Sequence, residues 1–211
     1  MSAIQGRRVP RRARALSAAL FVAATALPGC ALTRRYDMAR IHADAAARED
    51  RNPDRNPVIF IHGFIGAKLR NERTSEGVWG RLANAITRSQ VDDLDLPIEA
   101  ADLKNNRDHL VPYALYESVA GVKFYGAMID ALETTGGYRI GDIRDPQPGD
   151  TGFVYVYDWR RDNVESATGL AEAIHRVRTR LKAPQMRFDI VAHSMGGLVA
   201  LYYLMYGGVD V

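Results

Sequence analysis

The feature that most constrains this chain is a short apolar run that breaks at a serine between small residues and then turns apolar again. It reads F-D-I-V-A-H-S-M-G-G at 188–197. Residues 188–192 have the β-branched character of a strand, and the glycines after Met195 allow a helix to begin close to that strand. A tight turn between them lifts the Ser194 hydroxyl to where a general base can reach it. The pattern therefore predicts a nucleophile elbow with Ser194 as the candidate nucleophile.

The small residues around this serine support the same interpretation. The usual pattern is G-x-S-x-G, and Ala192 replaces its first glycine with the smallest possible change, a single methyl group. Gly196 supplies room for the backbone at the second position. The alternative, a solvent-facing serine in an ordinary helix cap, is disfavoured by the I-V that precedes the turn and the apolar helix that follows it.

A second buried strand is predicted upstream, at Val58–Ile61, because V-I-F-I is a continuous apolar run of the kind found in parallel sheets. It leads into H-G-F-I-G, whose glycines allow the backbone to bend so that an amide N–H faces an oxyanion. The amide of Phe64, after Gly63, is the predicted donor, and the amide of Met195 is its predicted partner. We interpret His62 as a residue that fixes this loop rather than as a base.

The remaining pattern alternates strands with helices. F-V-Y-V-Y at 153–157 predicts a strand, Asp162 and Glu165 a helix cap, and 198–206 a central helix buried on nearly all sides. We therefore expect an α/β fold with a mostly parallel sheet, flanking helices and a site at the carboxyl ends of the strands.

Two segments between the first two strands are less regular. Residues 67–120 read as an insertion that either forms a cap over the site or packs on the domain; in it, Trp79 stands at helical spacing from Leu82 and Ile86. Residues 122–133 have a helical pattern that ends at two glycines.

The first residues resemble an export signal. Five arginines lie before the apolar stretch Leu16–Pro28, which is too short to span a membrane permanently. It ends in L-P-G-C, similar to the lipobox of bacterial lipoproteins, and Cys30 is the only cysteine of the chain. We expect a signal peptide at 1–29, a tether at 30–57, a domain at 58–211, and anchoring of the exported protein in the bacterial envelope, periplasmic or outer-membrane, through lipidated Cys30. Cleavage by the ordinary signal peptidase is the alternative.

Charge and composition exclude other classes of function. Residues 1–29 hold five arginines and no acidic residue, so their removal leaves 23 basic and 25 acidic side chains, a net charge of −2. The basic isoelectric point of the whole chain is thus no argument for nucleic-acid binding. No cluster of His, Cys and carboxylates has metal-ligand spacing, and no metal or other cofactor is expected. Protein partners are not indicated.

Three segments together resemble a known family. They are P-V-I-F-I-H-G-F-I-G-A-K-L, V-Y-V-Y-D-W-R and V-A-H-S-M-G-G, within residues 57–211. In this order they are similar to α/β-hydrolases, and the Y-D-W-R narrows the resemblance to the lecithin:cholesterol acyltransferase-like lipases and acyltransferases. The resemblance implies the α/β-hydrolase fold, acylation of Ser194 and an oxyanion contact from the Phe64 amide. That family commonly has P-G where this chain has His62-Gly63, a form seen in many bacterial lipases.

Asp158 and Arg160 admit two interpretations. They form either a substrate or triad element, or a structural ion pair that fixes the turn after the strand. A catalytic acid in this fold follows the nucleophile in chain order, whereas Asp158 precedes it. We therefore favour the structural role.

The residues after the nucleophile limit the activity. Only 17 residues follow Ser194, and they include Asp210 but no histidine. We expect the triad acid and histidine to lie outside this chain, which would be truncated and nearly inactive alone. The predicted function of the full protein is hydrolysis of carboxylic esters, with lipid esters favoured, through an acyl-enzyme. An acyltransferase of the same mechanism and a non-catalytic, lipid-anchored lipoprotein are the alternatives.

Overall fold

A computed structural model of the protein describes residues 37, 39–40, 43, 55–80, 94–96, 108–119, 122–123 and 125–207. The chain divides into two units, Met1–Ile41 and His42–Val211, and every element named below belongs to the second. The predicted signal peptide and Cys30 lie outside the described residues. Among the described helices, none has both the length and the apolar character needed to cross a membrane.

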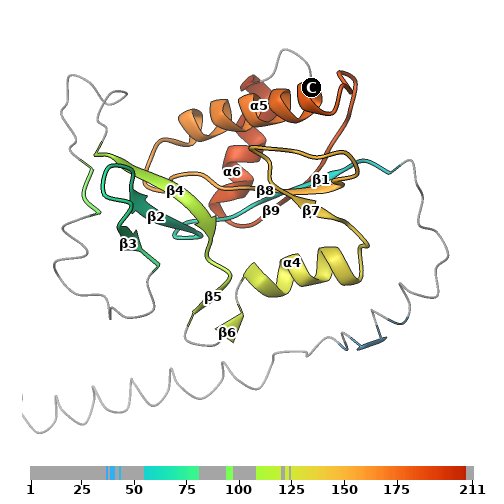
Figure 1. Cartoon of the computed structure of the whole chain (residues 1–211), viewed down its shortest axis with the longest axis horizontal. Coiled ribbons are helices and arrows are strands. Elements are labelled where there is room, and N and C mark those ends of the chain that lie inside the picture. Colours follow the sequence, from blue (N-terminus) through green and yellow to red (C-terminus); the bar gives the residue numbers. More distant parts are fainter. Residues whose placement is uncertain are drawn as a thin grey trace, which may run out of the picture. The chain divides into compact units, whose positions relative to one another are not determined.

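The centre of the second unit is a parallel sheet of four strands (Figure 1). Their spatial order is β7 (Ile140–Gly141), β8 (Gly152–Tyr155), β1 (Val58–Ile61) and β9 (Asp189–Ala192). The last residue of β1, Ile61, lies opposite Tyr155 of β8 and Ala192 of β9, so these three strands end at the same edge. The predicted α/β architecture with a parallel sheet is confirmed.

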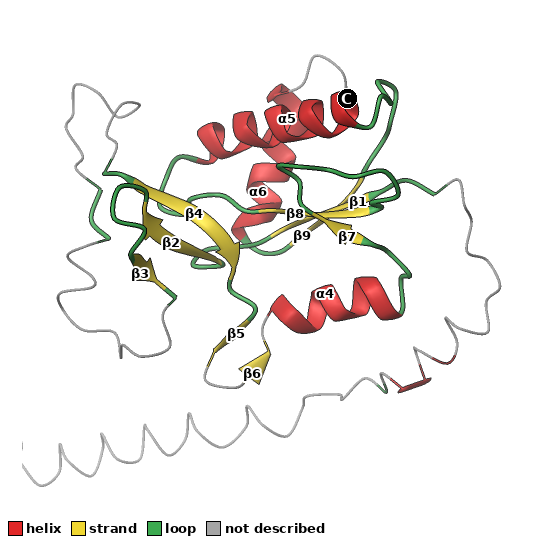
Figure 2. Ribbon diagram, in the orientation of Figure 1, coloured by secondary structure: helices red, strands yellow, loops and turns green. Residues whose placement is uncertain are grey.

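Strand β1 is covered on both faces, as its continuous apolar run predicts. Because side chains alternate along a strand, Phe60 packs towards Tyr125 and Leu115 on one face, while Ile59 and Ile61 belong to the main core on the other. Helix α4 (Tyr125–Thr134) lies on the Phe60 face, and α5 (Asn163–Arg180) and α6 (Met195–Tyr202) lie on the opposite face (Figure 2).

Helix α5 connects β8 to β9 and begins at its predicted cap. The carboxylate of Asp162 accepts a hydrogen bond from the amide of Val164 at 2.7 Å, which satisfies one of the free N–H groups of the first turn. Glu165 does not complete a capping box, because its carboxylate accepts from the guanidinium of Arg161 at 2.8 Å.

Helix α6 continues into a π-helical turn, η1 (Tyr203–Gly207). One side is buried against α5 and β1, with Val199 fully inaccessible. The outer side is not: five apolar side chains are 49–71% exposed, at Leu198, Leu201, Leu204, Met205 and Tyr206. The prediction of a helix buried on nearly all sides is therefore wrong. Among the described residues β9 pairs only with β1, so no described strand extends beneath this side of α6.

The predicted insertion contains a separate antiparallel sheet. Its spatial order is β3 (Gly77–Trp79), β2 (Ala67–Asn71) and β4 (Leu110–Leu115), and a small hairpin of β5 (Ser118–Val119) and β6 (Val122–Lys123) leads into α4. Trp79 thus lies in a strand, and the helical spacing that we read from it is wrong; Leu82 and Ile86 lie outside the described residues. Its indole instead packs on Trp159, with ring centroids 5.6 Å apart.

Candidate active site

Ser194 occupies a strained turn between β9 and α6. Its backbone angles are φ 52° and ψ −123°, and the amide of Gly196 donates to the carbonyl of His193 at 2.9 Å. This is the geometry of a type II′ turn with Ser194 at its first central position, where glycine is the usual residue. Such strain costs a non-glycine residue roughly 1–3 kcal/mol and collects at functional sites. The Ser194 residue is exposed at the carboxyl edge of the sheet.

Two glycines bring this turn against the end of β1. A β-carbon on Gly196 would lie 2.4 Å from the carbonyl oxygen of His62 and 2.7 Å from that of Ile61. A β-carbon on Gly63 would lie 2.9 Å from Cβ of Ser194. Only glycine permits these approaches, so both positions bring the two turns into contact. Ala192, in contrast, is exposed, and its methyl group is accommodated at the edge of β9.

The second turn, His62–Gly66, follows β1 directly. The amide of Gly66 donates to the carbonyl of Gly63 at 3.1 Å, and Ile65 has a positive φ of 56°. Phe64 and Ile65 form the tip and are 58% and 43% exposed. The ring of Phe64 meets the indole of Trp159 edge to face at 4.9 Å. An apolar tip therefore lies beside the exposed serine.

His62 is buried and fully engaged in fixing this turn. Its Nε2 accepts the amide N–H of Tyr157 at 3.2 Å, so its single proton is on Nδ1, which donates to the carbonyl of Gly63 at 2.8 Å. The phenol of Tyr157 stacks on the imidazole at 4.3 Å and donates to the carbonyl of His62 at 2.9 Å. Burial lowers the pKa of His62 to about 4, against the two backbone hydrogen bonds, which raise it. The ring is neutral at physiological pH.

The predicted oxyanion donors belong to these two adjoining turns. The amide of Phe64 lies in the turn after β1, and the amide of Met195 is the first of α6, where a helix has no intrahelical acceptor. Within the described residues neither amide donates a hydrogen bond. Because Gly63 contacts Ser194, both donors come from residues next to the nucleophile turn or within it.

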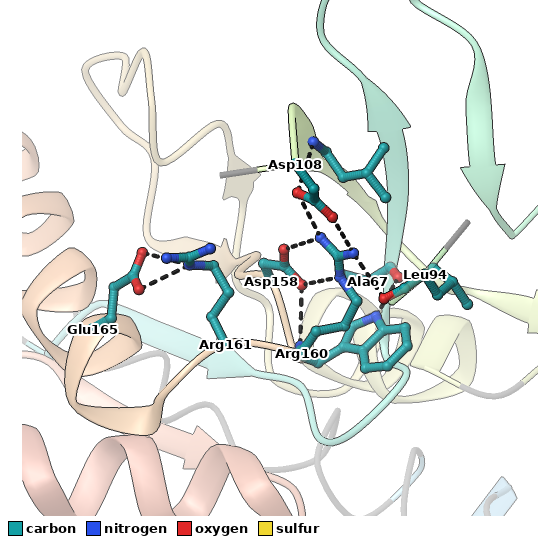
Figure 3. A network of polar contacts seen from close by, with 9 residues as sticks. Ala67, Leu94, Asp108, Asp158, Arg160, Arg161 and Glu165 are labelled. Atoms are coloured by element: carbon teal, nitrogen blue, oxygen red, sulfur yellow. Dashed lines mark hydrogen bonds and ion pairs between the residues drawn. The ribbon is translucent and has the colours of Figure 1, made fainter. Parts of the chain in front are cut away.

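Asp158 and Arg160 lie in a separate network (Figure 3). The guanidinium donates to Asp158 at 2.7 Å, to the carboxylate of Asp108, and to the carbonyl of Leu94 at 3.1 Å. The side chains of Arg160 and Asp158 are only 4% and 6% exposed. Burial raises the pKa of Asp108, but the hydrogen bonds and charge of Arg160 together lower it below its ordinary value. The network joins the strand end to residues 94 and 108, and none of its described contacts reaches Ser194.

No described histidine is placed as a base for the serine. His62 is engaged as above, His109 contacts Glu72 at 3.3 Å, and His175 is exposed on α5. The Nδ1 of His193 contacts the hydroxyl of Tyr125 at 2.8 Å. None of these four rings hydrogen-bonds to Ser194 Oγ, and His42 lies outside the described residues. Within the described part, no group of His, Cys, Asp and Glu side chains is arranged to hold a metal ion.

Sequence reasoning missed two side chains that hold the site together. Tyr157 was visible only as part of the V-Y-V-Y strand pattern, and Tyr125 only as part of the helical pattern at 122–133. A lone tyrosine carries no signal for a contact 62 residues away along the chain.

Comparison with known proteins does not show a family for this chain. No protein-family model matches it. The uncharacterized protein YJR098C of Saccharomyces cerevisiae is 27% identical over 143 residues, which are 68% of this chain but only 20% of the yeast protein. A chain in the crystal structure of the Tle4-Tli4 complex aligns with 74% of this chain and 43% of its own length, at 18% identity and a TM-score of 0.38. A TM-score this low does not establish a common fold. The chain thus spans about a fifth of its yeast relative.

Proposed function

We propose that this chain carries the nucleophile and oxyanion turns of a serine hydrolase that acts on carboxylic esters, on an α/β-hydrolase fold. The observation that carries the proposal is the backbone of Ser194, which is exposed and strained between a parallel strand and a helix, at φ 52° and ψ −123°. An ordinary helix cap needs no such conformation. Strain that a structure maintains at an exposed nucleophile is typical of an active site.

In the proposed reaction, Ser194 Oγ attacks the ester carbonyl carbon as a base removes its proton. The carbonyl π-bond becomes the oxyanion, which the amides of Phe64 and Met195 would stabilise. When the carbonyl re-forms, the bond to the alcohol oxygen breaks, and the alcohol leaves with the proton. Water then cleaves the acyl-enzyme and releases the acid. A second alcohol in place of water would make the same site an acyltransferase.

The base and its orienting acid would come from outside the described residues. None of the four described histidines contacts Ser194 Oγ. A serine without its histidine retains only the contribution of oxyanion donors and binding, roughly 10³- to 10⁴-fold over water in serine proteases. We therefore propose the esterase activity for the whole protein.

An apolar acyl group fits the surroundings of the serine. Phe64 and Ile65 are exposed beside it, and the ring of Phe64 rests on the buried indole of Trp159. Burying such side chains against an acyl chain removes apolar area from water at roughly 25 cal/mol per Å². This surface favours lipid esters over small polar esters.

A specific observation also supports a second candidate, a non-catalytic hydrolase-like lipoprotein. The serine makes no side-chain hydrogen bond with a described residue. In this alternative the fold binds a ligand, and the strained turn at Ser194 no longer supports catalysis.

For both candidates we propose export and lipid anchoring through Cys30. The support is the basic and apolar leader that ends in L-P-G-C. The test is metabolic labelling with a fatty acid during expression in bacteria. The wild-type protein should incorporate label and the Cys30→Ser variant should not; labelling of neither would point to ordinary cleavage of the leader.

The test of the enzyme is covalent labelling with a fluorophosphonate ester, followed by peptide mass mapping. It is made on the protein expressed from its complete gene. We expect label on Ser194 in the complete product and its loss in Ser194→Ala. The matched control is Ser75→Ala, because Ser75 is also an exposed serine with a positive φ, 59°, but lies in a turn of the antiparallel sheet. Folded protein without label on Ser194 would reject the enzyme in favour of the non-catalytic candidate.

A further inference from the structure

Tyr125 is a buried residue that reaches the site from the opposite side of the sheet. It is the first residue of α4 and is 1% exposed. Its ring meets Phe60 of β1 edge to face at 5.5 Å and stands at the same centroid distance from the imidazole of His193. Its hydroxyl therefore lies at the carboxyl edge of the sheet, between β1 and β9.

This hydroxyl makes one hydrogen bond to each of the two turns. The amide of Gly63 donates to the phenol oxygen at 2.8 Å, and the same oxygen lies 2.8 Å from Nδ1 of His193. Gly63 contributes the proton of the first bond, and the hydroxyl is the donor of the second when Nδ1 is the unprotonated nitrogen of the His193 ring. The His193 ring then carries its own proton on Nε2. Burial raises the pKa of Tyr125, so the hydroxyl stays protonated at neutral pH.

The two bonded residues directly precede the groups that would act on the substrate. Gly63 precedes Phe64, whose amide is the proposed oxyanion donor, and His193 precedes Ser194. A bridge between them fixes the spacing of donor and nucleophile. Each turn also has its own contacts, since His62 fixes the first and the backbone bond from Gly196 closes the second. Among the described residues, the Tyr125 hydroxyl is the side-chain group that hydrogen-bonds to both turns.

We propose that Tyr125 is a positioning residue, whose hydroxyl holds the turn at Gly63 and the turn at His193 in the register needed for attack by Ser194. This inference rests on the proposed function. Tyr125 acts through the two turns and takes no part in bond making. A displacement of about 1 Å between reacting groups can reduce a rate on the order of 10²-fold, so loss of the bridge should affect the chemical step more than substrate binding.

The experiment compares Tyr125→Phe with Tyr155→Phe in the complete gene product. Both remove a buried phenol hydroxyl; that of Tyr155 donates to the carbonyl of Ser166 at 2.7 Å, and its position is in β8. With a fluorophosphonate, the maximal phosphonylation rate constant and the half-saturating concentration are measured separately. We expect Tyr125→Phe to lower the maximal rate about 10- to 100-fold with little change in half-saturation, and Tyr155→Phe to stay within about 2-fold. Equal losses in both variants, or none in Tyr125→Phe, would overturn the proposal.

A second variant tests the bridge independently, in case Tyr125→Phe does not fold. His193→Phe keeps a ring at an exposed position but removes the Nδ1 acceptor, while the bond from Gly63 to Tyr125 remains. It should lower the maximal rate by a smaller factor, about 3- to 10-fold. An unchanged rate in this variant would show that the bridge to the nucleophile turn has no positioning role.

A measurement that does not depend on activity separates failure of the proposed esterase function from failure of the positioning role of Tyr125. Hydrogen exchange at the Gly63 amide and the ring tautomer of His193 are measured by NMR. Tyr125→Phe should speed exchange at Gly63 by about 5-fold, because a net hydrogen bond of about 1 kcal/mol is lost. If wild-type protein shows the protected amide but no label on Ser194, the proposed function fails and the positioning role fails with it. If wild type is labelled and Tyr125→Phe reacts equally fast, only the positioning role fails.

Discussion

The two turns at the carboxyl edge of the sheet differ in how they are held. The turn after β1, at 62–66, is secured by its own side chain: both nitrogens of the buried His62 ring are hydrogen-bonded, and Tyr157 stacks on it. The turn after β9, at 193–196, is exposed, has one backbone bond across it, and forces a positive φ on Ser194.

The difference indicates a division of labour between a rigid support and a reactive group. A turn anchored by a buried, doubly hydrogen-bonded imidazole cannot move without leaving a donor or acceptor unsatisfied, at a cost of about 1–3 kcal/mol for each. The exposed turn has no such protection and retains its strain because neighbouring atoms restrict it. The rigid turn at 62–66 thus provides the fixed surface on which the strained turn at 193–196 packs.

The largest predicted effect follows from the contact between the two turns. A β-carbon on Gly196 would meet two backbone carbonyl oxygens, 2.4 Å and 2.7 Å away, and backbone cannot move aside as a flexible side chain can. Gly196→Ala should lower the free energy of unfolding by about 3 kcal/mol. Urea denaturation followed by circular dichroism measures it.

Gly197→Ala is the matched control, because it lies next in the same helix and a β-carbon there meets no atom within 4 Å. It should raise the free energy of unfolding by up to about 1 kcal/mol, since alanine is favoured over glycine inside a helix. Equal losses in both variants would mean that the N-terminus of α6 does not rest against β1.

The turn after β1 should also respond to pH, through its buried His62. The pKa of His62 is about 4 in the folded protein against 6.5 for the free side chain. Between pH 6.5 and 4 the His62 side chain therefore binds a proton in the unfolded state but remains mostly neutral in the folded state. The contribution of neutral His62 to the free energy of unfolding is fully present above pH 6.5. It should fall by about 3 kcal/mol as the pH decreases to 4.

The measurement is the free energy of unfolding against pH for wild type and His62→Asn. Asparagine does not titrate, so other groups cancel in the difference between the two curves. The wild-type curve should be steeper between pH 4 and 6.5. Parallel curves would show that the pKa of His62 is the same in the folded and unfolded protein, and that its Nε2 does not accept from Tyr157.

Sequence patterns were sufficient for the sheet because each depends on local periodicity. V-I-F-I at 58–61 implied a strand buried on both faces, and the chemistry of Asp162 implied the start of α5; both are observed. The apolar character of α6 was predicted correctly, but the burial of its outer face was not. Burial depends on what packs nearby, and hydropathy alone does not distinguish a covered face from an uncovered one.

The contacts within the site were beyond reach for a similar reason. Ser194 could be identified because a strand, small residues and a helix are adjacent in the sequence. Tyr125 and Tyr157 join it through bonds between residues 62 to 95 positions apart, which no local pattern specifies. Trp79 was misplaced because its spacing fits a helix, whereas antiparallel pairing with β2 makes it part of a strand.

A smaller effect tests whether the exposed turn is strained. Glycine adopts positive φ without penalty, so Ser194→Gly should raise the free energy of unfolding by about 1 kcal/mol after the extra entropy of unfolded glycine is deducted. The same variant should lose fluorophosphonate labelling. Ser194→Ala, which keeps the β-carbon and the strain, should leave the free energy of unfolding within about 0.5 kcal/mol of wild type. If Ser194→Gly is no more stable than Ser194→Ala, the backbone at Ser194 is not strained.

The smallest predicted effect concerns the outer face of α6. Leu201 is 53% exposed, so Leu201→Gln should change the free energy of unfolding by less than about 0.5 kcal/mol. Val199, two positions earlier and fully buried, provides the contrast, because Val199→Ala should cost about 2 kcal/mol. Should Leu201→Gln prove as costly as Val199→Ala in the complete gene product, this face of α6 is covered in the folded protein. The nucleophile turn at the start of the same helix would then be as firmly supported as the turn after β1.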